Sequence, residues 1–336
     1  MNEHELEQFR QQAKALLTLS GPIGNSPRVV EMKGRRVILA DRVSSRDGYS
    51  LQDALVVRGS FTCGTGSRFD APVYAGGACE IGKNSRLHSI ATDGRLRLAT
   101  NAQVNGCAWS AEPMELRPDS WVESATSPAS IQIADSAGAR ELFSPVIASQ
   151  DQLPDLGEPA PPVSHMELPP PHWNRLPQFE MLPGFRQERL SALDDETWYY
   201  DGNLTFPFPL LLRGNLVVKG LFRCSANSLL EFDVKSGGSL HVGAGSICRG
   251  QLTSLADMVL GDGCLFSGSL KARASLRLCS GVRGFRRGTP VEAETNGTLH
   301  FEPNVVVRGH LTGGGGVRCC LPEAEGSLRL LMAESG

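Results

Sequence analysis

An 18-residue repeat constrains the fold of this 336-residue chain more than any other feature. In the second half, residues that begin equivalent short stretches recur every 18 positions, and each stretch ends six positions later. A fixed period of this length predicts a solenoid, because each coil must return to the same lateral position before the next coil stacks on it. The starting residues are Cys224, Val242, Leu260 and Leu278, and their partners are Leu230, Cys248, Phe266 and Gly284, the last being the weakest copy.

The first half of the chain shows the same register. The starting residues there are separated by 18, 17 and 18 positions, and their partners keep those steps. Two blocks of one architecture are therefore predicted. The starting residues are Cys63, Ile81, Leu98 and Leu116, and their partners are Phe69, Leu87, Val104 and Val122.

Within a coil the local period is two, which is typical of β-strands and not of helices. Between Leu270 and Leu278 the even positions are apolar or small, and the odd positions are mostly basic. Even residues should therefore point inward and odd residues outward. A coil of 18 residues at roughly 3.3 Å per residue has room for three short strands and three bends. The sequence predicts an all-β fold, a triangular β-helix in two blocks.

The segment 3–19 has the pattern of an amphipathic helix, with Leu6, Phe9, Ala13, Leu16 and Leu17 on one face. Such a helix could cap a solenoid end or lie on a membrane surface. Its mixed charges favour the cap, because interfacial helices carry mainly lysine and arginine on the polar face.

Proline and aromatic residues divide the rest of the chain. The segment 150–209 combines a dense proline run with several aromatic residues, which predicts an extended connector that packs in part against the blocks. The expected organisation is an N-terminal helix at 1–20, a first β-helix block at 28–149, the connector at 150–209, a second block at 210–320 and a C-terminal tail at 321–336.

Charge and hydropathy restrict the class of protein. The formal net charge is −3, so bulk electrostatics select no particular partner. No apolar run approaches the roughly twenty residues of a membrane span, and the N-terminus lacks a signal-peptide pattern. We expect a cytoplasmic protein that binds no specific nucleic acid.

The nine cysteines fit structural roles better than chemical ones. Cys63, Cys224, Cys248 and Cys264 fall at repeat or inward positions, where a reduced thiol serves as a small apolar side chain. The adjacent pair at 319–320 has no second pair nearby to complete a zinc site. We expect no cofactor, no metal and no small-molecule substrate.

Four short phrases carry a resemblance to a known family. They read LVVRG at 55–59, LVVKG at 216–220, LHVG at 240–243 and VVVRG at 305–309. In these phrases the chain resembles the bactofilins, polymer-forming cytoskeletal proteins of bacteria. The resemblance implies a compact β-helix whose copies join end to end without nucleotide. The chain departs from that family in having two blocks and an aromatic, proline-rich connector, and a covered end would stop a filament.

The resemblance makes a second copy of the chain the expected partner, in a homo-oligomer or a filament. A membrane surface and other scaffolded proteins are further candidates. Exposed coil ends would join by strand pairing and apolar contact. The residues expected to mediate this self-association are Val305, Val306 and Val307 in the last coil, and Leu210, Leu211 and Leu212 at the start of the second block.

A run of basic residues offers a candidate surface for anions. Six occur within seventeen positions with no acid among them, and such a stripe can bind anionic lipid or nucleic acid. The alternative, which we favour, is a solvated face in a chain that balances its charge elsewhere. The residues are Lys271, Arg273, Arg277, Arg283, Arg286 and Arg287.

An enzyme is the alternative from another class. Acyltransferases built on left-handed β-helices use hexapeptide repeats, and three hexapeptides also make eighteen residues. Such enzymes generally need a histidine as general base. The candidates are His88, His241, His300 and His310, and none has a recognisable companion motif. We therefore expect a scaffold and no catalytic residues.

Overall fold

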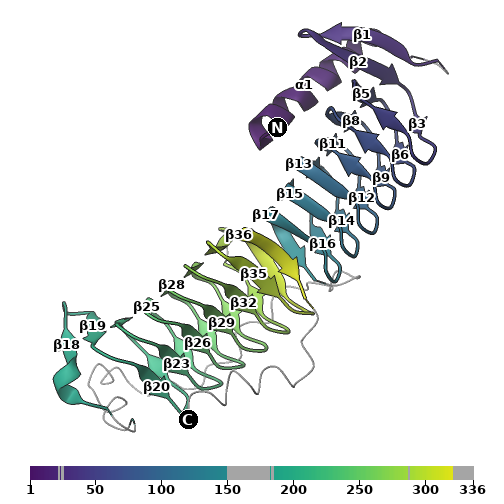
Figure 1. Cartoon of the computed structure of the whole chain (residues 1–336). Helices are drawn as coiled ribbons and strands as arrows, with labels where there is room; N and C mark the ends of the chain where they lie inside the picture. Colours follow the sequence, from purple (N-terminus) through teal and green to yellow (C-terminus); the bar gives the residue numbers. More distant parts are fainter. Residues whose placement is uncertain (22, 24–25, 150–181, 183–184, 287, 321–336) are drawn as a thin grey trace. The chain divides into compact units, whose positions relative to one another are not determined.

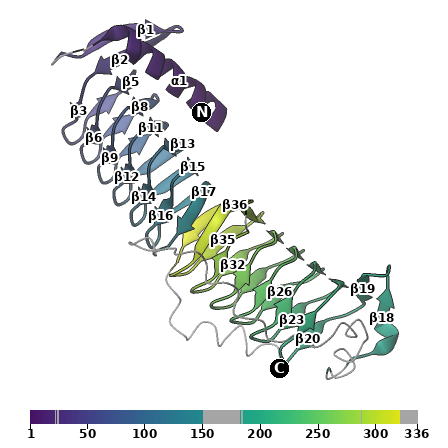
Figure 2. The ribbon, with the colours of Figure 1, turned by 180° about the vertical axis from the view of Figure 1, so that it is seen from behind.

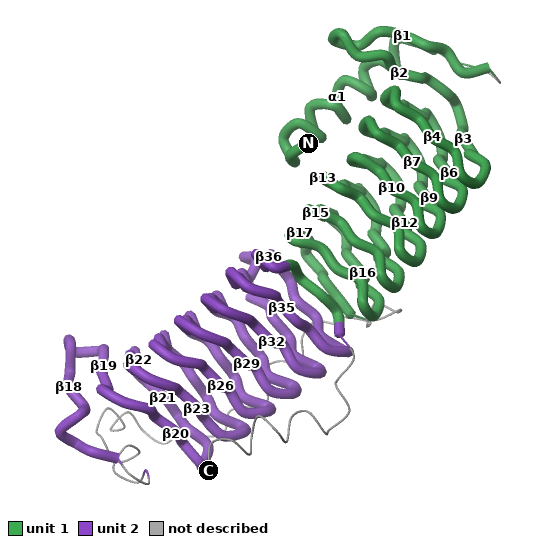
Figure 3. Tube along the Cα trace, in the orientation of Figure 1, with its two compact units in different colours: residues 1–149, 316–319 green, residues 150–315, 320–336 purple. Residues whose placement is uncertain are grey.

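The computed structural model describes residues 1–21, 23, 26–149, 182, 185–286 and 288–320. The chain divides into two compact units (Figure 3). Unit 1 comprises Met1–Ser149 and Gly316–Cys319, and unit 2 comprises Gln150–Gly315 and Cys320–Gly336. Each unit is a parallel β-solenoid, which confirms the predicted fold class.

Every coil contributes strands to three faces, which we call A, B and C in chain order (Figure 1). In unit 1, face A contains β1 (Arg28–Met32), β2 (Arg35–Ala40), β5 (Ala54–Val57), β8 (Val73–Ala75) and β11 (Ile90–Thr92). Face B contains β3 (Val43–Ser44), β6 (Phe61–Cys63), β9 (Cys79–Ile81), β12 (Leu96–Leu98), β14 (Met114–Leu116) and β16 (Ile131–Ile133). Face C contains β4 (Ser50–Leu51), β7 (Arg68–Phe69) and β10 (Arg86–Leu87). The longer strands β13 (Gln103–Ser110), β15 (Trp121–Thr126) and β17 (Gly138–Ala148) turn the corner from face C to face A.

Unit 2 repeats this arrangement. Face A contains β18 (Leu190–Ala192), β19 (Thr197–Tyr200), β22 (Asn215–Val218), β25 (Val234–Ser236), β28 (Leu252–Ser254), β31 (Leu270–Ala272) and β34 (Val291–Thr295). Face B contains β20 (Leu204–Phe206), β23 (Phe222–Cys224), β26 (Leu240–Val242), β29 (Met258–Leu260), β32 (Leu276–Leu278) and β35 (Thr298–Phe301). Face C contains β21 (Leu211–Leu212), β24 (Leu229–Leu230), β27 (Ile247–Cys248), β30 (Leu265–Phe266), β33 (Arg283–Gly284) and the start of β36 (Val306–Cys319). A 3-10 turn, η2 (Gln187–Arg189), precedes β18.

Inward side chains form the core, as the alternation predicts. In β31, Leu270 and Ala272 are buried while Lys271 between them is exposed. Parallel pairing places Leu252 beside Leu270 and Leu240 beside Met258, so equivalent inward residues stack from coil to coil. The four cysteines expected at inward positions are buried and free.

Buried serines satisfy backbone groups at the bends between strands. The hydroxyl of Ser236 donates to the carbonyl of Gly220 at 2.6 Å, and that of Ser254 donates to Gly238 at 2.9 Å. A buried polar group of this kind costs little when its hydrogen bonds are made. The serines thus join each bend to the preceding coil.

The weakest copy of the repeat, Gly284, has a steric explanation. A side chain at this inward position would collide with the ring of Phe266, which occupies the equivalent position one coil earlier. Phe266 is itself fully buried. The large ring of Phe266 therefore fills the space that a side chain at position 284 would otherwise occupy.

The single helix of the described chain, α1 (Glu3–Ser20), confirms the predicted amphipathic segment. Its N-terminus carries a capping box, in which the Asn2 side chain accepts from the Glu5 amide and the Glu5 carboxylate accepts from the Asn2 amide. The helix does not cap the end of the solenoid. It lies along face A beside β8 and β11 (Figures 1 and 2), because the outward residues of that face are apolar.

The second solenoid begins earlier than the sequence indicated. β19 and β20, within the segment assigned to the connector, pair in parallel with β22 and β23 and form the first coil of unit 2. Their aromatic residues Tyr200 and Phe206 are buried inward.

Candidate functional site

The apolar face of α1 packs on outward side chains of unit 1. Leu6, Phe9, Ala13 and Leu17 are buried in one cluster with residues of face A. The face A members of this cluster include the outward residues Val37, Leu39, Val56, Tyr74 and Ala91. The apolar face of the helix is thus already buried within unit 1, and only Leu19 near its C-terminal end is largely exposed, at 86%.

A carboxylate anchors the polar side of this helix. Asp93 is 2.7 Å from the ammonium of Lys14 and 3.2 Å from the guanidinium of Arg10, and it accepts a hydrogen bond from the Tyr74 hydroxyl at 2.8 Å. Burial raises the pKa of Tyr74, and the charge of Asp93 raises it further. The phenol therefore remains a donor. Arg10 also lies over the ring of Trp109, 3.8 Å from its centroid.

Two residues hold the C-terminal end of α1. The Arg58 guanidinium donates to the backbone carbonyls of Leu17 and Gly21 and pairs with Asp41 at 3.1 Å. Asp41 in turn accepts from the amide of Ile23. These bonds satisfy carbonyls that the end of a helix leaves without partners.

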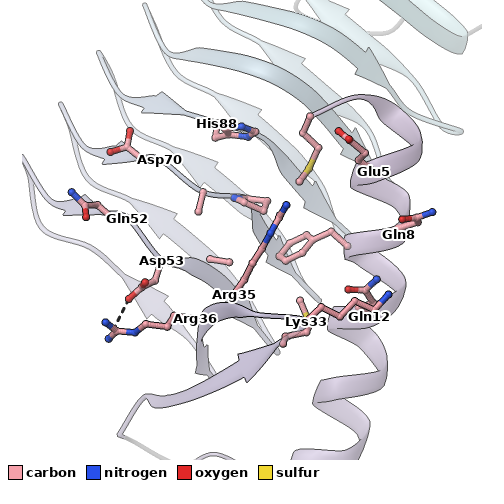
Figure 4. A pocket seen from close by; sticks show the side chains of 16 residues that line it. Glu5, Gln8, Gln12, Lys33, Arg35, Arg36, Gln52, Asp53, Asp70 and His88 are labelled. Carbon is pink, nitrogen blue, oxygen red and sulfur yellow. Dashed lines mark ion pairs between the residues drawn. The ribbon is translucent and has the colours of Figure 1, made fainter.

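A cavity of about 750 Å³ lies between α1 and the edge of face A (Figure 4). Arg36 on its wall pairs with Asp53 at 3.5 Å. Burial lowers the pKa of His88, and nearby positive charges lower it further. Basic and acidic side chains are equally numerous around the cavity, so its charge selects no class of ligand. They are Lys33, Arg35 and Arg36 against Glu5, Asp53 and Asp70.

The first coil of unit 1 presents an apolar end. Its inward residues Ile38, Val43 and Leu51 are only half-buried, whereas Leu55, Phe61 and Phe69 beside them in the next coil are fully buried. Two further apolar side chains of this region are exposed. Val29, in the hairpin of β1 and β2, is 58% exposed, and Tyr49, in the first coil, is 37% exposed. We call these five residues, Val29, Ile38, Val43, Tyr49 and Leu51, the first-coil end. Sequence reasoning missed this surface, because 28–51 departs from the strict repeat.

The first coil of unit 2 is covered by its own chain. Phe185 stacks on Tyr200 with ring centroids 5.8 Å apart, and Leu182 is buried. Phe206 contacts both Phe208 and Phe222. Aromatic side chains thus fill this end.

Most of the residues predicted to mediate self-association are buried within unit 2. Val305, Val306 and Val307 are buried, and β36 pairs Val306 and Val307 with Arg283 and Gly284 of the preceding coil. Leu210 and Leu212 are also buried, and Leu211 points outward in β21. Only Leu211 of this predicted set offers a partly exposed side chain.

The basic stripe does not form one surface. Lys271, Arg277 and Arg283 lie on faces A, B and C respectively, because one coil passes through all three faces. Lys271 is 3.6 Å from Glu294 and Arg277 is 2.8 Å from Glu302. Arg273 and Arg286 are exposed at bends, and Arg287 lies outside the described residues.

Within the described ranges, one group of three side chains has metal-ligand spacing: Asp262, Cys279 and Glu302, whose ligand atoms lie within 4.8 Å of one another. The Glu302 carboxylate is already bound by Arg277 and by the Ser280 amide. Burial raises the pKa of Cys279 to about 12, and the charge of Glu302 contributes. A protonated thiol beside an arginine-bound carboxylate is a poor cation site.

The four histidines considered for catalysis are dispersed. His88 lines the cavity of unit 1, His241 points outward on face B, and His300 contacts the Cys320 sulfur at 3.4 Å. His310 contacts the Thr312 hydroxyl at 3.2 Å. The structure does not bring them together in a site.

Comparisons with family models, curated proteins and solved structures found no match to this chain. Among the described helical residues, no segment has the length and apolar character of a membrane span.

Proposed function

We propose that this protein is a β-helical scaffold, similar to the bactofilins, that self-associates without nucleotide through the first-coil end of unit 1. One observation carries the proposal: the inward apolar column of unit 1 reaches its first coil with Ile38, Val43 and Leu51 half-buried. Every other described coil of this unit has a neighbour that buries the equivalent residues. A second molecule would complete the burial.

The chemistry of this end favours apolar contact over strand pairing. Within the described residues, β3 pairs only with β6 and β4 only with β7, but each strand has two residues and offers few backbone bonds. Full burial of a valine, leucine or isoleucine side chain contributes about 1.5–3 kcal/mol. Several such side chains supply enough free energy for a stable contact.

The difference between the two first coils limits the kind of assembly. A filament needs two different complementary surfaces, whereas contact between two copies of one surface closes as a dimer. The first coil of unit 2 is filled by its own aromatic side chains, including Phe206, and Phe185 stacks on Tyr200 there. We therefore favour a closed dimer joined through two copies of the first-coil end.

The test measures oligomeric state with no nucleotide present, by light scattering after size exclusion and by negative-stain microscopy at several salt concentrations. Val43→Lys should raise the dissociation constant at least about 100-fold, because a lysine would replace an apolar contact at the centre of the interface. Ser44→Lys is the matched control, since Ser44 is the exposed neighbour on the same strand.

Circular dichroism of Val43→Lys should show unchanged sheet content, because its lysine can point into solvent in the monomer. A monomeric wild-type chain at micromolar concentration would refute the proposal. So would equal association of the Val43→Lys and Ser44→Lys variants.

A further inference from the structure

Unit 2 carries a stack of aliphatic side chains on the solvent side of face C. Strand pairing places Leu211 beside Leu229, Leu229 beside Ile247, and Ile247 beside Leu265. All four are half-buried. We call this row Leu211, Leu229, Ile247 and Leu265 the leucine ladder.

The ladder is not needed to fill the core of unit 2. The inward partners on the same strands, such as Leu230 and Phe266, are fully buried and supply the core. Face C of unit 1 has Arg68 and Arg86 at the equivalent outward positions. An apolar outward row is therefore a specific feature of this face and calls for an occupant.

The rims of the ladder differ in chemistry. Along one side runs a column in which Glu231 pairs with Arg213 at 3.3 Å and with Arg249 at 3.0 Å. Exposed Arg283 follows Leu265 at the end of the ladder. Three arginines and one glutamate give this border a formal charge of +2. Along the other side, Gly245 and Gly263 leave room for close approach.

We propose that the C-terminal sixteen residues, 321–336, bind the leucine ladder of the same chain. This segment lies outside the described residues, and its sequence matches the ladder in chemistry. It holds one Arg and three Glu, a formal charge of −2 without the terminal carboxylate, against the +2 border. Its apolar residues are Leu321, Leu328, Leu330, Leu331 and Met332.

The end of the described chain lies within reach of the ladder. Cys320 is held on face B of the last coil, where its amide donates to the Phe301 carbonyl. Leu265 lies on face C three coils earlier: strand pairing runs from Leu265 to Arg283 and Val306, and the chain then crosses face A at 309–313 before it reaches Cys320. Three coil steps are roughly 15 Å, and seven extended residues, 321–327, span about 23 Å. The apolar residues that follow can therefore contact Leu265 and Ile247.

Unit 1 provides the precedent for such covering. There α1 buries an outward apolar row of face A. The proposal is independent of the first-coil end, which belongs to the other unit. Its consequence is that the side of unit 2 is closed by the chain itself, so that the ladder is unavailable for contact between molecules.

Photocrosslinking of the full chain tests this proposal. Leu330 is replaced by p-benzoylphenylalanine, and a mixture of ¹⁴N-labelled and ¹⁵N-labelled protein is irradiated and digested with trypsin. Arg223, Lys235, Arg249 and Lys271 separate Leu229, Ile247 and Leu265 into different peptides. Crosslinks to these peptides within a single isotope label are expected.

Leu229→Lys combined with Ile247→Lys should reduce the crosslink yield at least about tenfold, since two apolar contacts become charged. Val217→Lys combined with Thr253→Lys, both at outward positions of face A, is the matched control and should leave the yield unchanged. Crosslinks only between different labels, crosslinks mainly outside the ladder, or no crosslinks would overturn the proposal. None of these outcomes depends on whether Val43→Lys alters dimerisation.

Discussion

Face A is built from matching strands in the two units, but within the described residues only unit 1 places a helix on it. The phrase LVVRG at 55–59 and the phrase LVVKG at 216–220 occupy the same place in their coils. Beside Val56 stand Tyr74 and Ala91, whereas beside Val217 stand Lys235 and Thr253. Inward residues thus determine that a solenoid forms, and outward residues determine what binds to its side.

The two units also differ in how they use an equivalent pair of charged residues, which follow neighbouring face A strands at the start of each unit. Asp41 and Arg58 in unit 1 correspond to Asp201 and Lys219 in unit 2, which form an ion pair at 2.9 Å. In unit 1 the arginine also binds carbonyls of α1 and the aspartate binds the amide of Ile23. In unit 2 the pair stands exposed. The pair in unit 1 anchors α1 because it also binds backbone groups, whereas the pair in unit 2 is an ordinary surface ion pair.

The largest effect should come from a charge beneath α1. Val56→Lys places an ammonium at a fully buried outward position and should destabilise unit 1 by about 3 kcal/mol or more. Val217→Lys, at the equivalent position in unit 2, should change stability by less than about 0.5 kcal/mol. Urea unfolding and tryptic cleavage at Arg10 and Lys14 would measure the two effects. Equal losses would show that α1 does not protect face A.

The helix anchor gives the next largest difference. Arg58→Ala should cost about 2 kcal/mol, because it removes the donor of the Leu17 and Gly21 carbonyls and the ion pair with Asp41. Lys219→Ala should cost at most about 0.5 kcal/mol, since an exposed ion pair contributes little. Hydrogen exchange of the α1 amides should increase in the first variant. If Lys219→Ala were the more costly change, the assignment of Arg58 as an anchor would fail.

A smaller loss is expected at Asp93. Asp93→Asn keeps a group that can accept from the Tyr74 hydroxyl but removes the charge that binds Lys14 and Arg10, at a cost of about 1 kcal/mol. High salt should reduce this difference from wild type, because salt weakens the exposed part of the ion pairs. The measurement is urea unfolding at low and high ionic strength. A difference that salt does not change would mean that the charge is not responsible.

The smallest effect is pH-dependent. Burial depresses the pKa of His88 from its usual 6.5 in the folded chain, so the unfolded chain takes up the proton first as pH falls. The stability of unit 1 should therefore decrease as pH falls from about 7 through 6.5 and below. His88→Gln should flatten this dependence for hydrogen exchange of α1. His241→Gln should not, although burial also depresses the pKa of His241 in unit 2, and an identical response would contradict the assignment to His88.

Much of the fold could be predicted because the inward residues repeat along the sequence. The alternation from Leu270 to Leu278 indicates which side chains enter the core without any knowledge of handedness or ends. The site of α1 could not be predicted in this way. In a phrase such as Leu55-Val56-Val57 the outward Val56 resembles its inward neighbours, so the sequence does not reveal that it faces a helix.

The candidate surfaces were harder to predict, for a geometric reason. Lys271, Arg277 and Arg283 are close in sequence, but one coil carries them to three different faces. Conversely, Leu211, Leu229, Ile247 and Leu265 are each 18 residues apart and form one row. In a solenoid, neighbours on the surface are found at the repeat distance and not along the chain. Reading outward positions at intervals of 18 could have found the ladder.

The hydrogen bonds between coils have a mechanical consequence. The amide of Leu240 donates to Asp257 and that of Leu252 donates to Ser269, so these bonds run from one coil to the next along the stack. Tension along that axis would load the bonds directly and detach terminal coils one after another. Each detached coil of 18 residues would lengthen the chain by about 60 Å when extended. A solenoid of this kind should therefore extend under force in steps of equal length, one coil at a time.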